Sequence, residues 1–257
     1  MKRWLAVPFL AAPFLAVLTA CAPVQTHRQP SAPLPFQADF SDVGVTWVSG
    51  GQAFVARAPS LRAQLAPLPA PAVAAAWVGN VAWGALPSAG LIVTLDGPPE
   101  TRVVGRVAKL SQQRIYLQDG TALNYSGGAA GGVLGTPSAV LTGGDGEEYA
   151  LVGGNLYRPG SPASLLSPAR LGTDAPAYVY RLPGRGVAVS SLPSVQTGQG
   201  LYRLTGSALE RLGSGDQPVA SVPHGPGLIG AVGGRIVTLS AAGQIRVFLP
   251  DLREVRP

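Results

Sequence analysis

The stretch "YALVGGNLYRPGSPASLLS" (residues 149–167) contains three short apolar runs, the first two separated by a pair of glycines and the last two by a Gly/Ser/Pro turn. Gly153 and Gly154 can adopt the positive φ angles that two-residue hairpin turns require. The runs beside them are short and rich in residues that favour extended backbone. The stretch therefore predicts three short antiparallel strands joined by tight turns.

This pattern recurs along the chain. Residues 198–213 and 228–249 are clear copies, residues 45–65 and 74–95 fit the same form, and residues 103–125 fit it more loosely. The expected second strands are spaced by about 37 residues on average, and they begin near Gln52, Val81, Arg114, Asn155, Gly200 and Arg235. With 34 glycines and 25 prolines, no long stretch keeps a helical period without a helix breaker. The chain is therefore predicted to be all-β.

Further apolar runs lie between these copies, at residues 139–141, 178–180 and 219–222. Adding one run to each copy gives about four strands per unit, and units of this size resemble the blades of β-propellers. A four-stranded sheet cannot bury both faces alone, whereas a ring of sheets can. We therefore predict a β-propeller of six blades over residues 38–251. The alternatives are five or seven blades, a pair of β-sandwiches or an irregular β-solenoid.

Closure of such a ring requires the first and last units to meet, because an open ring would expose a sheet edge. The segments expected at this seam are residues 36–40 and 252–255. We expect one of them to add a strand to the blade of the other.

The N-terminal segment has the pattern of an export signal. Lys2 and Arg3 precede an uncharged apolar run at residues 4–18, and small residues follow it. The run is shorter than the roughly 20 residues that a membrane-spanning helix needs. The tetrad of residues 18–21, Leu-Thr-Ala-Cys, resembles the bacterial lipobox. That resemblance implies cleavage before Cys21 and attachment of a diacylglyceryl group to its thiol.

Cys21 is the one cysteine in 257 residues, so an internal disulfide is impossible and lipidation gives an exported chain a reason to carry it. Lipoproteins kept on an inner membrane often have aspartate after the cysteine; Ala22 stands here, which favours an outer membrane where there are two. We expect a signal peptide at residues 1–20, a Pro-rich tether at 21–35 and the propeller domain at 36–257.

Residues with catalytic or metal-binding chemistry are few. Beyond the signal the chain has two histidines, His27 in the tether and His224 in a Pro/Gly-rich segment, which we interpret as solvated linker and exposed turn residues. The acidic run "GGDGEE" (143–148) lacks the alternation of an EF-hand loop, so a turn with solvated acids is expected. Residues 126–135 are glycine-rich without the Lys-Ser/Thr of a P-loop, which predicts a flexible loop between units three and four. We expect no catalytic residues, metal or cofactor.

Large aromatic side chains recur in the repeats, including Trp47, Trp77 and Trp83, and we interpret them as core packing between blades. Charged residues make up 12% of the chain and form no basic cluster, which excludes nucleic acid as a natural partner.

Together these features favour a monomeric, lipid-anchored envelope protein with a non-catalytic propeller. We expect that propeller to bind an envelope protein, a peptide or a glycan. The alternative is an envelope hydrolase or lyase with a central metal site, because propellers of that kind gather acids and amides around a cation.

Overall fold

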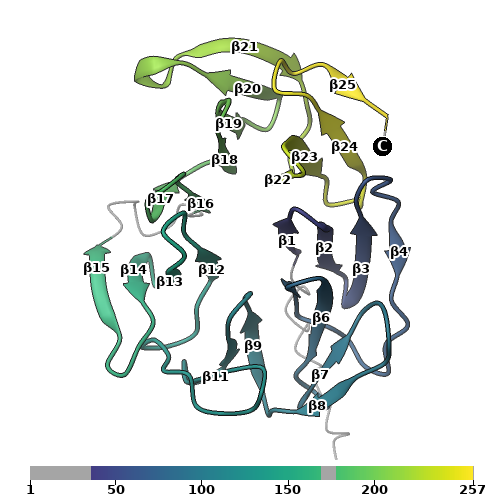
Figure 1. The fold of residues 1–257 in the computed structure, drawn as a ribbon, viewed down its shortest axis with the longest axis vertical. Coiled ribbons are helices and arrows are strands. Elements are labelled where there is room, and N and C mark those ends of the chain that lie inside the picture. The colour runs from purple at the N-terminus through teal and green to yellow at the C-terminus, as the bar shows by residue number, and fades with distance from the viewer. Residues whose placement is uncertain (1–35, 169–177, 257) are drawn as a thin grey trace, which may run out of the picture. The chain divides into compact units, whose positions relative to one another are not determined.

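Seven antiparallel sheets make up the described part of the chain (Figure 1). The computed structural model describes residues 36–168 and 178–256. The predictions for the signal peptide, Cys21, the tether and His27 lie outside these residues. The one helix in the described ranges is a 3-10 turn, η1 (Ser214–Asp216), and no helix there is long and apolar enough to cross a membrane.

The sheets follow one another along the sequence, and within each sheet the strands pair in chain order. Sheets 1 to 3 consist of the following strands: β1 (Gln37–Ser41), β2 (Gly44–Ser49), β3 (Gln52–Arg57) and β4 (Gln64–Leu65); β5 (Ala74–Val78), β6 (Val81–Leu86), β7 (Leu91–Thr94) and β8 (Thr101–Val103); β9 (Val107–Leu110), β10 (Ile115–Leu117) and β11 (Ala122–Leu123).

Sheets 4 to 7 consist of the following strands: β12 (Ala139–Thr142), β13 (Glu148–Val152), β14 (Asn155–Arg158) and β15 (Ser164–Pro168); β16 (Tyr178–Arg181) and β17 (Val187–Ser190); β18 (Ser194–Thr197), β19 (Gly200–Leu204), β20 (Ala208–Leu212) and β21 (Pro218–Pro223); β22 (Leu228–Val232), β23 (Arg235–Leu239), β24 (Ile245–Phe248) and β25 (Glu254–Val255). Sheet 5 therefore has two described strands, whereas five of the other sheets have four.

The sheets form a closed ring within the unit of residues 33–257. The first strand of each sheet contacts the first strand of the next, in the order β1, β5, β9, β12, β16, β18 and β22, and β22 contacts β1 again. These strands surround the centre of the ring, and the later strands of each sheet lie outward (Figure 1). The predicted β-propeller fold is confirmed.

The predicted number of six units of about 37 residues differs from the seven sheets of the structure. Gly153 and Gly154 have φ angles of 54° and 78°, as the hairpin prediction requires. However, they join the second and third strands of sheet 4, whereas Gly233-Gly234 joins the first and second strands of sheet 7. The same turn chemistry serves either hairpin of a blade, so the repeats of the sequence pattern fall out of phase with the sheets. The pattern therefore assigns the strands of sheet 5 to a neighbouring unit and predicts one unit too few.

Apolar clusters fill five of the seven interfaces between sheets. They lie between sheets 1 and 2, 2 and 3, 3 and 4, 6 and 7, and 7 and 1. Trp47, Trp77 and Trp83 belong to three of these clusters and are at most 4% exposed, which confirms their interpretation as packing residues. No such cluster of described residues fills the two interfaces of sheet 5.

The ends of the chain do not exchange strands at the seam. β1 pairs with β2 and β25 pairs with β24, so each end completes its own sheet and the prediction of an added strand was wrong. Side chains close the ring instead. Phe40 packs so closely on Gly230 of β22 that a Cβ there would lie 2.1 Å from the Phe40 Cγ. Residues of both chain-end segments, 36–40 and 252–255, also pack against the apolar cluster between sheets 7 and 1. This cluster supplies the burial that an exchanged strand would have provided.

The glycine-rich segment 126–135 is fastened to sheet 3 along part of its length. The backbone N–H of Ala130 donates to the carbonyl of Ala122 at 2.9 Å, and that of Val133 donates to Gly120 at 2.9 Å. Val133 is buried in the cluster between sheets 3 and 4. The segment thus takes the place of a fourth strand in this sheet, although the sequence predicted a flexible loop.

Candidate functional site

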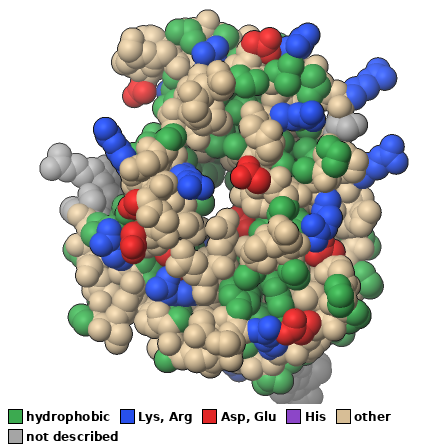
Figure 2. Space-filling view, in the orientation of Figure 1, with side chains coloured by type: hydrophobic (Ala, Val, Ile, Leu, Met, Phe, Trp, Pro, Cys, Tyr) green, Lys and Arg blue, Asp and Glu red, His purple; other side chains and the backbone are tan. Residues whose placement is uncertain are grey.

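A central cavity of about 850 Å³ lies among the first strands of the sheets. Its walls come mainly from β1, β12, β16, β18 and β22, and Figure 2 shows the hollow at the centre of one face of the ring. Cavities of about 300–1,000 Å³ are typical of small-molecule sites. We call this cavity the channel.

Asp39 brings a carboxylate to the channel from β1. Its Oδ2 accepts the backbone N–H of Trp77, in the neighbouring sheet, at 2.7 Å. Burial raises the pKa of Asp39 to about 6, although the Trp77 N–H and the positive charge of Lys109 act in the opposite direction. The side chain is half-buried and lines the channel. Asp39 is therefore a carboxylate whose ionised form has less than its usual solvation.

Lys109 brings an ammonium group to the same cavity from β9. Its Nζ donates to Gln37 Oε1 at 2.6 Å and to the carbonyl of Ser138 at 3.0 Å, so it bridges the first strands of sheets 1 and 3 and the start of β12. Burial lowers the pKa of Lys109 to about 8, and the negative charge of Asp39 opposes this shift. An ammonium group has three donors, and two are used here.

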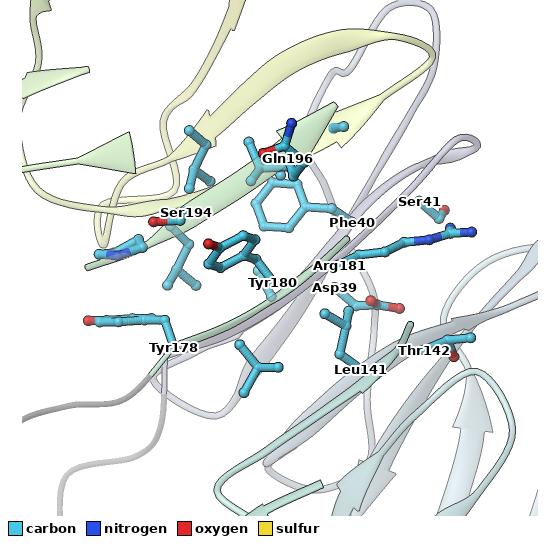
Figure 3. Close-up of a pocket in the computed structure, with 18 of the residues that line it drawn as sticks. Asp39, Phe40, Ser41, Leu141, Thr142, Tyr178, Tyr180, Arg181, Ser194 and Gln196 are labelled. Carbon is cyan, nitrogen blue, oxygen red and sulfur yellow. The ribbon is translucent and has the colours of Figure 1, made fainter. Parts of the chain in front are cut away.

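The wall formed by sheets 5 and 6 is more open. Tyr178, Tyr180 and Arg181 extend from β16, and Ser194 and Gln196 extend from β18 (Figure 3). The two tyrosines are half-buried and Arg181 is exposed. This wall offers aromatic faces together with hydroxyl, amide and guanidinium groups.

The charges of the channel are not joined in ion pairs. The described residues form five ion pairs, all outside the channel: Arg57–Asp96, Arg102–Glu100, Arg114–Glu148, Arg203–Glu210 and Arg246–Glu254. Neither Asp39 nor Lys109 is a member of any of them. Asp39 and Lys109 thus line one cavity, together with Asp42 and Arg181, and both can still form further hydrogen bonds.

His224 is not the exposed turn residue that the sequence predicted. It is 7% exposed, its Nδ1 lies 2.6 Å from the carbonyl of Gly225, and its Nε2 lies 2.8 Å from Thr238 Oγ1. A carbonyl only accepts hydrogen bonds, so Nδ1 carries a proton. The ring packs near Phe248 in sheet 7, away from the channel lining, because the preceding strand β21 directs it inward against β23.

The acidic run 143–148 also differs from its prediction as a solvated turn. Glu147 is exposed, but Glu148 is 2% exposed and begins β13. Its carboxylate accepts hydrogen bonds from Ser111 and Tyr116 and from Arg114 Nη1 at 3.0 Å. Burial and the charge of Glu148 raise the pKa of Tyr116. This network joins sheets 3 and 4, and strand alternation gave no sign of it because its partners lie in another sheet.

Sequence patterns identified neither Asp39 nor Lys109 as a site residue. The available signals were weak: Asp39 lies between Ala38 and Phe40 near the start of the predicted domain, and Lys109 is the one lysine after Lys2. Within residues 36–168 and 178–256, no group of three His, Cys, Asp or Glu side chains is placed to hold a metal ion. The channel presents opposite charges, amides and aromatic rings to its interior.

Comparison with known proteins identifies a fold and no family. No protein-family model matches the sequence, and no curated protein matches it. Among solved structures, a chain of a mitotic checkpoint complex is 12% identical with a TM-score of 0.58, and the match covers 93% of this chain and 98% of that one. A chain of PorZ, a bacterial surface component of the type-IX secretion system of Porphyromonas gingivalis, is 14% identical with a TM-score of 0.52. That match covers 87% of this chain and 38% of PorZ. At these identities the likeness concerns the fold alone.

Proposed function

We propose that this protein is a lipid-anchored lipoprotein of the cell envelope whose propeller is a non-catalytic binding module. The proposed anchor depends on residues 1–21, where a charged start, an apolar run and the lipobox-like tetrad precede Cys21. Two or three acyl chains on that residue would hold the protein on a membrane, since each buried methylene contributes about 0.8 kcal/mol. The Pro-rich residues 21–35 would separate the lipid from the propeller.

The observation that carries the binding role is the channel itself. It combines a volume typical of ligand sites with charged, amide and aromatic side chains on strands of a closed ring. Rigid strands hold these groups in fixed positions, as a binding site requires. The proposed partner is an envelope protein, a peptide or a glycan that presents polar groups to this cavity.

The anchor is tested by Cys21→Ser. We expect the variant to remain as an uncut or mislocalised precursor, because no thiol is available for the diacylglyceryl group. Fractionation and mass spectrometry of the N-terminus measure both effects. Normal processing together with unchanged membrane partition would contradict the anchor.

The binding role is tested by photo-crosslinking in intact envelopes. A photoreactive residue at Gln196 faces the channel, whereas one at Val219, which is 64% exposed on β21, faces outward and serves as the matched control. We expect a discrete adduct from position 196 that is absent from position 219. Equal labelling from both positions would contradict a binding role for the channel, and no adduct from position 196 would contradict an envelope macromolecule as its occupant.

A further inference from the structure

The most specific chemistry in the channel is the pair formed by Asp39 and Lys109. Both side chains line the same cavity, and neither belongs to an ion pair among the described residues. Each charge acts on the pKa of the other, but the two groups are not in ion-pair contact. Each can therefore still pair with an opposite charge that enters the cavity.

The protein holds the Lys109 ammonium group and the Asp39 carboxylate in place through hydrogen bonds. Each group can still form further hydrogen bonds with a ligand. Gln37 and Ser138 fix the Lys109 Nζ through two of its three donors. The Trp77 N–H fixes one oxygen of Asp39, and a carboxylate can accept about four hydrogen bonds. The positions of both charges are therefore set by a side-chain amide and two backbone groups of the protein before any ligand arrives.

We propose that the channel binds a small zwitterionic ligand, a peptide or an amino acid, with its carboxylate on Lys109 and its ammonium group on Asp39. One molecule with both charges matches two opposite charges that are fixed but not joined. Tyr178 and Tyr180 on the opposite wall supply apolar surface for its side chains (Figure 3). The raised pKa of Asp39 and the lowered pKa of Lys109 agree with this assignment, since burial disfavours both charges and a bound zwitterion places an opposite charge in contact with each. This ligand class rests on the proposed function, because it names what the binding module holds.

The test is calorimetric titration of the full-length protein in detergent with the tripeptide Ala-Phe-Ala, whose charges lie at its two ends alone. Two derivatives remove one charge each: the C-terminal amide and the N-acetyl form. We expect each derivative to bind about tenfold more weakly than the free tripeptide, as expected for loss of one charge-assisted hydrogen bond. Free phenylalanine separates the two sources: equal affinity for it assigns the site to single amino acids, and weaker binding assigns it to peptides.

Two channel variants assign the contacts. In Lys109→Met the tripeptide and its C-terminal amide should bind equally, and in Asp39→Asn the tripeptide and its N-acetyl form should bind equally. Lys109→Arg and Asp39→Glu keep the charge and should restore part of the discrimination. Arg253→Met removes an exposed charge that does not line the channel and should change nothing. Thermal unfolding of each variant confirms that it is folded.

The assignment would be overturned if the C-terminal amide still bound more weakly than the tripeptide in Lys109→Met, or if the N-acetyl form did so in Asp39→Asn. A wild-type protein that binds no form of the tripeptide and no phenylalanine would overturn it as well. If the position-196 crosslink persists in that case, the ligand class fails while the proposed binding role stands. If the crosslink is absent and the tripeptide binds, the site is retained and its partner in the envelope is not a macromolecule.

Discussion

Sheet 2 and sheet 5 occupy equivalent places in the ring but are built differently. Sheet 2 has four strands, and nearly all residues of its first two strands are buried. Sheet 5 has two described strands, and from residue 178 to residue 201 no residue is buried. Apolar clusters flank sheet 2 on both sides, whereas none of the described clusters flanks sheet 5. The channel is lined by sheet 5 and not by sheet 2. Apolar packing is thus concentrated around sheet 2, whereas the least buried wall of the channel lies at sheet 5.

The largest expected effect tests this division directly. Trp77→Ala removes a side chain that is 1% exposed in the cluster between sheets 1 and 2, and should lower the free energy of unfolding by about 3–5 kcal/mol. The matched change in sheet 5, Tyr180→Ala, should cost about 1 kcal/mol, because that side chain is half-buried at the channel. Urea unfolding measures both. Equal losses of unfolding free energy in the two variants would show that sheets 2 and 5 contribute equally to stability.

The next effect concerns the boundary between the two sides. Glu148→Ala leaves Arg114, Tyr116 and Ser111 without their common acceptor between sheets 3 and 4. We expect a loss of about 3 kcal/mol, as for other broken buried pairs. Glu147→Ala changes its exposed neighbour and should cost less than about 0.5 kcal/mol. A small loss for Glu148→Ala would mean that the network is not what joins these sheets.

A smaller effect is expected at the seam. Gly230→Ala places a Cβ against Phe40 and should cost about 1–3 kcal/mol, because Phe40 must move from the interface of sheets 7 and 1. Gly198→Ala is the control on the open side, since no atom lies within 4 Å of its Cβ and its φ is not positive. We expect a change of less than about 0.5 kcal/mol there. An unchanged melting temperature for Gly230→Ala would contradict closure by this contact.

The smallest effect is the pH dependence that Asp39 contributes. The pKa of Asp39 in the folded state, about 6, exceeds its ordinary value of 3.8, so between these pH values the folded state binds more protons than the unfolded state. Stability should therefore decrease as pH rises from about 4 to 6. In Asp39→Asn this decrease should shrink by about 1–2 kcal/mol, as measured by unfolding across that range. An identical pH profile in the variant would show that Asp39 is not the group responsible.

Local sequence patterns were sufficient to predict strands and turns. The glycine pairs predicted hairpins because their positive φ angles are a property of the residues themselves, and the apolar runs at 139–141, 178–180 and 219–222 predicted strands that the structure contains. The tryptophans predicted a core because such large apolar surfaces are stable only when buried. These features depend on a few consecutive residues, and so the sequence by itself determined the all-β class and the propeller-like repeat.

Tertiary structure decided what depends on contacts between sheets. The structure has seven sheets, and a glycine turn can belong to the first or to the second hairpin of a sheet. The packing of Phe40 on Gly230 closes the ring between sheets 7 and 1. Burial of His224 and Glu148 also depends on partners more than ten residues away, Thr238 and Ser111 among them. Asp39 and Lys109 are 70 residues apart in the chain and line one cavity because the ring brings β1 and β9 to it. The identity of a side chain does not predict such long-range contacts, because only the closed ring brings those strands together.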